Sequence, residues 1–264
     1  MITTYHRPQT LDEALTLLTQ PNTFPLGGGT LLASRHGTAD PVQVVDLQAL
    51  GLNSLTKNGN NLELGATLTL QALLESEHCP AALKSALKLE APLNIRNAAT
   101  VAGTLIACDG RSTFASVLLA MDAKIEQAIF DNSNIEYRVT NIGDFLPLRS
   151  TNLITKIVIP MNVKLAFESV AKTPADKPIV CAALAQWNSG RTRLVLGGYG
   201  KSPMLAMDGT EADGADTSST DHVLRSVQAA ARNTYHEATD EWASAEYRID
   251  VAATLAKRCL ENLA

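Results

Sequence analysis

The first part of the chain alternates between short apolar runs and one helical apolar pattern. Apolar residues recur at helical spacing behind Thr10 and Glu13, which form a capping pattern, and this predicts a helix over 11–19. Short apolar runs bounded by turn residues predict buried strands. These predicted strands lie at 24–26 and 42–47 and, after a hairpin tip at 58–61, at 62–66.

The remaining elements follow the same two periods. Helices are predicted at 70–75, 81–89, 112–121, 222–232 and 245–262, and strands at 123–129, 136–139, 152–159, 179–187 and 191–198. The polar stretch 171–178 is a predicted linker, and 208–221, rich in Asp, Gly, Ser and Thr, is a predicted loop. Helices and strands intermingle without a repeat, so the expected fold class is α+β. The expected division is a region 1–162 followed by a smaller sheet-plus-helix domain 163–264.

Composition limits the function class. The 264 residues are 45% hydrophobic and 19% charged, which is typical of a globular protein. Lys and Arg number 22 and Asp and Glu 27, a formal net charge of −5 without a basic run, so a nucleic-acid-binding surface is not expected. The chain opens without an apolar signal region, and no apolar stretch approaches the length of a membrane span. We therefore expect a cytoplasmic protein with no membrane span.

The cysteines and histidines do not form a metal-binding pattern. Neither the four scattered cysteines nor the five histidines show the spacing of a zinc site or an iron–sulfur cluster, so reduced, buried thiols are expected. Cys108 beside Asp109 and Arg111 is a conceivable activated thiol, because a nearby cation lowers a thiol pKa. A small residue lining a cofactor loop is the alternative that we favour. No residue is expected to be catalytic.

Two stretches of small residues are the candidate binding elements. The strand 24–26 runs into Gly27-Gly28-Gly29-Thr30, where backbone N–H groups without a Cβ nearby can approach an anion closely. The second stretch is Thr100-Val101-Ala102-Gly103-Thr104. Either stretch alone is also explained as a close-packed turn. Two together favour the diphosphate of a dinucleotide, and neither has the GxGxxG pattern, so a Rossmann domain is disfavoured.

Longer motifs resemble a known family. Tyr5-His6-Arg7-Pro8 and the helix after it resemble the opening of the flavoprotein subunits of molybdenum hydroxylases, which include the medium subunit of carbon monoxide dehydrogenase and the FAD domain of xanthine dehydrogenase. The segments 25–30 and 95–105 resemble this family's P-L-A-G-G-T/H and I-R-N-x-A-T-I-G-G-N-L motifs. The segments 118–123 and 244–248 resemble its later helix-to-strand segment and its S-A-E-Y-R segment. The resemblance spans nearly the whole chain in the right order.

The resemblance implies a fold and a cofactor. Region 1–162 would be a two-lobed FAD-binding domain of the vanillyl-alcohol oxidase type, with lobes at about 1–57 and 58–162, and 163–264 the family's C-terminal flavoprotein domain. The two small-residue stretches would hold the FAD diphosphate from both sides. The residues that the resemblance assigns to FAD binding are Leu26, Gly27, Gly28, Gly29, Thr30, Leu31, Thr100, Val101, Ala102, Gly103, Thr104 and Thr113.

The resemblance also implies a task and partners. In this family, a large molybdopterin subunit hydroxylates the substrate, and electrons pass through [2Fe-2S] clusters of a small subunit to FAD and on to NAD, a quinone or oxygen. This chain would be the FAD-binding electron-transfer subunit of such a hetero-oligomer. His6 would be structural rather than a point of covalent flavin attachment. The segment Glu246-Tyr247-Arg248 would anchor the last helix.

Four positions depart from the family pattern. The family has Asp or Ser at Leu31, a second Gly at Ala102, Asn at Thr104 and a flavin-binding Asp at Thr113. A lost hydrogen bond costs about 0.5–1.5 kcal/mol for a neutral group and about 1.5–3 kcal/mol for a charged one. Two losses therefore weaken binding roughly 10- to 1,000-fold. The rival hypothesis is a scaffold subunit of the same fold that has lost tight FAD binding.

Overall fold

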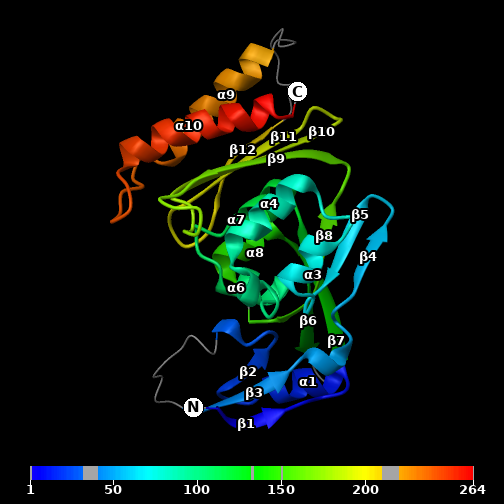
Figure 1. Ribbon diagram of the computed structural model, residues 1–264. Helices are drawn as coiled ribbons and strands as arrows, with labels where there is room; N and C mark the ends of the chain where they lie inside the picture. Colours follow the sequence, from blue (N-terminus) through cyan, green and yellow to red (C-terminus); the bar gives the residue numbers. More distant parts are fainter. Residues whose placement is uncertain (1, 32–40, 132–133, 150, 210–219, 264) are drawn as a thin grey trace. The chain divides into compact units, whose positions relative to one another are not determined.

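The chain forms two compact units of mixed helices and strands (Figure 1). The computed structural model describes residues 2–31, 41–131, 134–149, 151–209 and 220–263. The first unit comprises Met1–His78, Leu93–Ala107 and Lys124–Ile159, and the second comprises Cys79–Pro92, Cys108–Ala123 and Pro160–Ala264. The predicted α+β class is confirmed. Two segments of the N-terminal region, 79–92 and 108–123, pack with the second unit.

The first unit begins with a parallel three-stranded sheet. Its strands, in the order β1-β3-β2, are β1 (Ile2–His6), β3 (Val42–Asp46) and β2 (Thr23–Leu26). The helix α1 (Leu11–Leu18) starts where the capping pattern predicts, because the Thr10 hydroxyl accepts a hydrogen bond from the Glu13 amide. Its buried Ala14 and Leu15 share a hydrophobic cluster with residues of β3. A short 3₁₀ helix η1 (Gln48–Leu50) follows β3.

A five-stranded sheet completes the first unit. Its order β4-β5-β8-β6-β7 comprises β4 (Leu55–Asn58), β5 (Asn61–Gly65), β8 (Leu153–Pro160), β6 (Lys124–Asp131) and β7 (Asn134–Asn141). The short helices of this unit are α3 (Leu70–Glu75), α5 (Leu93–Arg96), α6 (Val101–Ala107) and α8 (Ile142–Leu148). The strand predicted at 62–66 is β5, and it pairs across the tip with β4, for which no strand was predicted.

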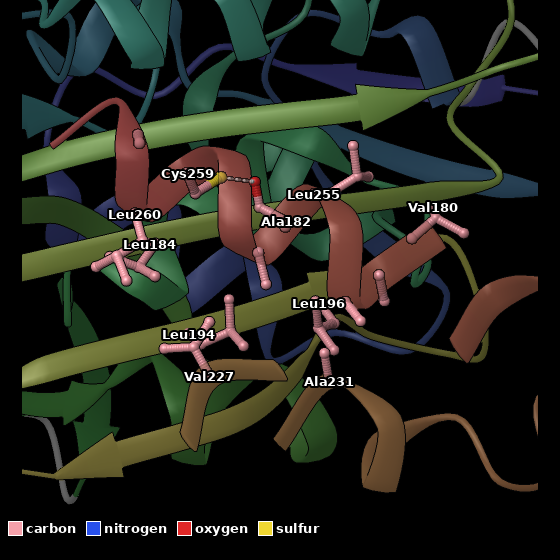
Figure 2. Close-up of a cluster of buried hydrophobic side chains, with 14 of the residues drawn as sticks. Val180, Ala182, Leu184, Leu194, Leu196, Val227, Ala231, Leu255, Cys259 and Leu260 are labelled. Carbon is pink, nitrogen blue, oxygen red and sulfur yellow. Dashed lines mark hydrogen bonds between the residues drawn. The ribbon is translucent and has the colours of Figure 1, made fainter. Parts of the chain in front are cut away.

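The second unit is one antiparallel sheet with helices on both faces. Its order β12-β11-β10-β9 comprises β12 (Met204–Gly209), β11 (Thr192–Gly197), β10 (Val180–Trp187) and β9 (Val163–Val170). Ala182 and Leu184 of β10 point into a core formed with α9 (Thr220–Thr234) and α10 (Ala245–Glu261), as Figure 2 shows. Cys181, one residue away on β10, contacts Ser116 of α7 (Thr113–Ala120), which packs with α4 (Ala81–Glu90). Successive side chains of a strand point to opposite faces, and helices cover both faces of this sheet, so β10 is buried on both faces.

Several elements were not predicted. The strands β1, β4, β9 and β12 and the helices α5, α6 and α8 are absent from the pattern-based expectations. β1, β9 and β12 each lie at the edge of a sheet. An edge strand packs fewer neighbours, so its apolar alternation is weaker; β1 is largely exposed. The predicted loop 208–221 begins within β12, and its residues 210–219 lie outside the described part of the chain.

Candidate functional site

The first small-residue stretch, 27–31, lies at the end of β2 and is called the first loop. Leu26, the last residue of β2, accepts a hydrogen bond at its carbonyl from the Leu47 amide, at 3.0 Å. Gly29 has φ of 71°, a left-handed conformation that glycine adopts without strain. Thr30 and Leu31 then have helical conformation, and the Leu31 side chain is 43% exposed. The first loop is therefore a sharp turn from a parallel strand.

The second stretch, 100–104, corrects one expectation. We expected a loop, but helix α6 begins at Val101. The reason is local: the buried Thr100 hydroxyl accepts a hydrogen bond from the Gly103 amide at 3.1 Å, and its carbonyl accepts one from the Thr104 amide at 2.9 Å. Thr100 thus works as a helix cap, which overrides the low helix propensity of Gly103. This stretch is called the second segment.

The two stretches meet within the first unit. A Cβ atom built on Gly28 would lie 1.7 Å from the Ala98 carbonyl oxygen, and one on Gly27 would lie 2.8 Å from the Thr100 hydroxyl oxygen. Neither position has room for a side chain. The obstacle at Gly28 is the backbone of Ala98, and the obstacle at Gly27 is the side chain of Thr100. The structure therefore brings together two stretches far apart in sequence, at a spacing that only glycine allows on one side.

The two stretches differ in the hydrogen bonds that their amides make. The Val101 and Ala102 amides donate to the carbonyls of Leu68 and Ala66, at 2.9 and 3.3 Å, and those of Gly103 and Thr104 donate to Thr100. The first loop is the opposite case. Within the described part of the chain, no acceptor receives a hydrogen bond from the amides of Gly27, Gly28, Gly29 or Thr30. The first loop thus offers unused main-chain donors.

The structure surrounds Thr113 with partners of its own. Thr113 belongs to the second unit and is fully buried. Its hydroxyl lies 2.7 Å from the Ala86 carbonyl oxygen and 3.1 Å from the Glu90 carboxylate. The same carboxylate accepts hydrogen bonds from the Ser112 hydroxyl and the Phe114 amide, both at 2.9 Å. Glu90 therefore binds the first turn of α7, an arrangement that the sequence did not reveal because Glu90 is distant in sequence and lies one residue beyond the predicted helix 81–89.

Two residues beside the first loop were missed by the sequence reasoning. Asp46, at the end of β3, is 5% exposed and pairs in register with Leu26. The Gln48 side-chain amide donates a hydrogen bond to the Gly27 carbonyl at 3.0 Å. A polar residue at the end of an otherwise apolar strand was the available signal, because the ends of parallel strands often line binding sites.

Two of the four thiols, those of Cys79 and Cys181, are unsuited to nucleophilic chemistry. All four cysteines are free and buried, as expected. Burial raises the pKa of both Cys79 and Cys181 to about 12, so these thiols stay protonated at neutral pH. Within the described residues, no group of three or more His, Cys, Asp or Glu side chains could hold a metal ion.

Arg248 anchors the last helix, as predicted. Its side chain is fully buried, and its guanidinium donates to the carbonyls of Ala238 and Ala243 and pairs with Asp240 at 2.8 Å. The Ser244 hydroxyl caps α10 by accepting a hydrogen bond from the Tyr247 amide. These bonds neutralise the buried guanidinium, so the segment 244–248 is structural.

Across the described helices, none has the length and apolar character needed to span a membrane.

The described residues thus define a class of α+β protein in which a glycine turn, whose amides donate to no described residue, meets a second small-residue segment without a Rossmann motif. Comparisons with known proteins define the class further. Residues 1–162 match the model of the FAD binding domain in molybdopterin dehydrogenase, and residues 165–263 match that of the CO dehydrogenase flavoprotein C-terminal domain. The chain belongs to this family of molybdenum hydroxylase flavoprotein subunits, and FAD is its cofactor.

Individual relatives agree with this assignment. The carbon monoxide dehydrogenase medium chain of Afipia carboxidovorans is 25% identical, with 98% of this chain and 95% of that protein covered. An uncharacterised Escherichia coli protein, YgfM, is 28% identical over 79% of each chain. Among solved structures, the carbon monoxide dehydrogenase of Hydrogenophaga pseudoflava has a chain of the same fold, with a TM-score of 0.82 at 21% identity over 98% of this chain and 96% of that one. The chain is thus an oxidoreductase component of the medium-subunit type.

Proposed function

We propose that the first loop and the second segment hold the FAD diphosphate, and that the chain passes electrons from the [2Fe-2S] clusters of a small subunit to an acceptor such as NAD or a quinone. The observation that carries the binding site is the set of amides at Gly27, Gly28, Gly29 and Thr30 that donate to no described residue, beside a wall that leaves no room for side chains at Gly27 and Gly28. A hydrogen bond to a charged group contributes about 1.5–3 kcal/mol, so two such donors account for substantial affinity.

The two stretches have different roles in this proposal. The first loop supplies main-chain donors, and its turn at Gly29 lets successive N–H groups face one anion. The second segment supplies a rigid wall, because its amides already bind Ala66, Leu68 and Thr100 within the chain. A preformed wall reduces the ordering entropy lost on binding. The departures at Ala102 and Thr104 then matter less than a missing donor in the first loop.

When bound, the flavin would supply the redox chemistry, because it can accept electrons singly and release them two at a time. The protein's own contribution is binding and orientation, and none of its residues needs to act as a general acid or base. The Thr104 hydroxyl, for example, has a structural role: it donates a hydrogen bond to the Thr100 carbonyl at 2.8 Å and so stabilises the start of α6.

We propose that the iron–sulfur clusters and the molybdopterin belong to partner subunits of a cytoplasmic complex. The four cysteines lie on separate elements of the chain, and burial raises the pKa of Cys79, Cys181 and Cys259. Such thiols are poor ligands, because a metal binds the thiolate. Co-purification of the tagged chain followed by mass spectrometry checks this part: recovery of a cluster-bearing chain and a molybdopterin chain is expected.

The rival scaffold function is favoured by one observation, the 43% exposed apolar side chain of Leu31 where the family has a polar residue. A visible spectrum of the purified chain separates the two. We expect absorption bands near about 370 and 450 nm, the free-flavin positions, before or after FAD is added. A protein that stays colourless after incubation with FAD and gel filtration would refute FAD binding and leave the scaffold role.

A further inference from the structure

A buried carboxylate lies beside the first loop. Asp46 is the last residue of β3, the central strand of the parallel sheet, and it is paired with Leu26, the residue before the loop. It is only 5% exposed. Burying a carboxylate is costly unless it is hydrogen-bonded or paired, so its partners indicate what it does.

Those partners come from the N-terminal motif and from the residue that follows β3. The Tyr5 hydroxyl donates to one carboxylate oxygen of Asp46, and Arg7 Nε lies 3.6 Å from the same oxygen. The other oxygen accepts a hydrogen bond from the Gln48 amide at 2.9 Å. The hydrogen bond to Asp46 raises the pKa of Tyr5, so the hydroxyl remains a donor at neutral pH. Asp46 therefore fixes the backbone at Gln48.

Gln48 in turn fixes the first loop. Its side-chain amide donates to the Gly27 carbonyl at 3.0 Å, and the neighbouring Leu47 amide donates to the Leu26 carbonyl at 3.0 Å. A peptide unit is planar, with its C=O and N–H pointing in opposite directions. Fixing these two carbonyls therefore also fixes the N–H directions of Gly27 and Gly28. Both N–H groups point away from the residues that hold the carbonyls.

We propose that Gln48 is a positioning residue, held by Tyr5 through Asp46, which orients the Gly28 amide toward the FAD diphosphate beside the Gly27 amide that Leu47 orients. This inference rests on the proposed function. It gives the N-terminal motif a role: Tyr5 and Arg7 satisfy the carboxylate that holds Gln48 in place. Tyr5 and Gly27 are distant in sequence from Asp46 and Gln48, and the parallel pairing of β1, β3 and β2 brings them together.

The test uses five variants of the full chain: two at Gln48, one at Gln43, and Tyr5→Phe alone and combined with Gln48→Leu. Gln48→Leu removes the donor, and Gln48→Arg keeps a side-chain N–H at this position. Gln43→Leu is the matched control, because Gln43 lies on β3, shortly before Gln48 in the sequence, but its side chain pairs with His6, at 3.0 Å. Dissociation constants for FAD and for ADP, which shares the diphosphate, are measured by titration of flavin-free protein, together with its thermal midpoint.

We expect Gln48→Leu to bind both FAD and ADP about 2- to 10-fold more weakly, the factor that one neutral hydrogen bond supplies. Gln48→Arg is expected to restore affinity, and Gln43→Leu to match the wild type. Tyr5→Phe should weaken FAD binding in the wild-type background but add nothing to Gln48→Leu, because the two residues act in series.

Two results overturn the inference in distinguishable ways. If the wild type binds FAD and Gln48→Leu binds it equally well, the positioning role is wrong while the proposed function stands, even when Gln48→Leu lowers the thermal midpoint. If the wild type binds neither FAD nor ADP, the proposed function fails, and the positioning role falls with it.

Discussion

Gly28 is the position where the smallest change should have the largest effect. In Gly28→Ala, the new Cβ would lie 1.7 Å from the Ala98 carbonyl oxygen and 2.5 Å from its carbon. An ordinary carbon–oxygen contact is about 3.3 Å, so the first loop and the second segment must separate by roughly 1.5 Å. Both partners are backbone, so no side chain can rotate away.

The magnitude follows from this separation. Forcing an extra carbon into a packed site costs about 1–3 kcal/mol, which for a chain of this size lowers the thermal midpoint by roughly 2–12 °C. The amides of Gly27 and Gly28 also leave their positions. Losing two hydrogen bonds to a charged diphosphate, at about 1.5 kcal/mol or more each, weakens FAD binding on the order of 100-fold.

The assay compares thermal denaturation and FAD titration for Gly28→Ala and for a matched control. Gly209→Ala makes the same chemical change at the end of β12, where a Cβ would meet nothing within 4 Å. The control should change stability by no more than about 0.5 kcal/mol and leave FAD affinity unaltered. Wild-type FAD affinity in Gly28→Ala would show that the cofactor does not bind where the two stretches meet.

Two further substitutions probe the second unit. Thr113→Val removes a hydroxyl that bonds to Ala86 and Glu90 in a fully buried site. We therefore expect a loss of about 1–3 kcal/mol in unfolding free energy with unchanged FAD affinity. A variant of normal stability that binds FAD poorly would instead support a flavin contact at Thr113. Asp208 has a pKa lowered by its hydrogen bonds to Arg191, so the unfolded chain binds more protons in acid and the contribution of Asp208 is lost as pH falls below about 4. Thermal midpoints between about pH 6 and pH 3 should therefore fall less steeply for Asp208→Asn than for the wild type, and parallel curves would contradict this linkage.

The sequence by itself determined the elements whose information is local. The capping pattern at Thr10 and Glu13 placed α1, because a cap is a contact between residues three apart. The apolar runs placed β10 and β11, since a strand buried on both faces is largely apolar. The family motifs likewise identified FAD as the cofactor, a statement about residue types in order along the chain.

Only the tertiary structure decided how the two small-residue stretches are used. Their residues look alike in sequence, yet the amides of 101–104 bind Leu68, Ala66 and Thr100 while those of Gly27–Thr30 bind no described residue. Which amides form hydrogen bonds within the chain depends on a bridge between Thr69 and Thr100. This is a pairing between distant residues that no local pattern encodes. The same holds for Asp46: its contact with the Gln48 amide is local, but Tyr5 meets it only because β1 and β3 pair as parallel strands.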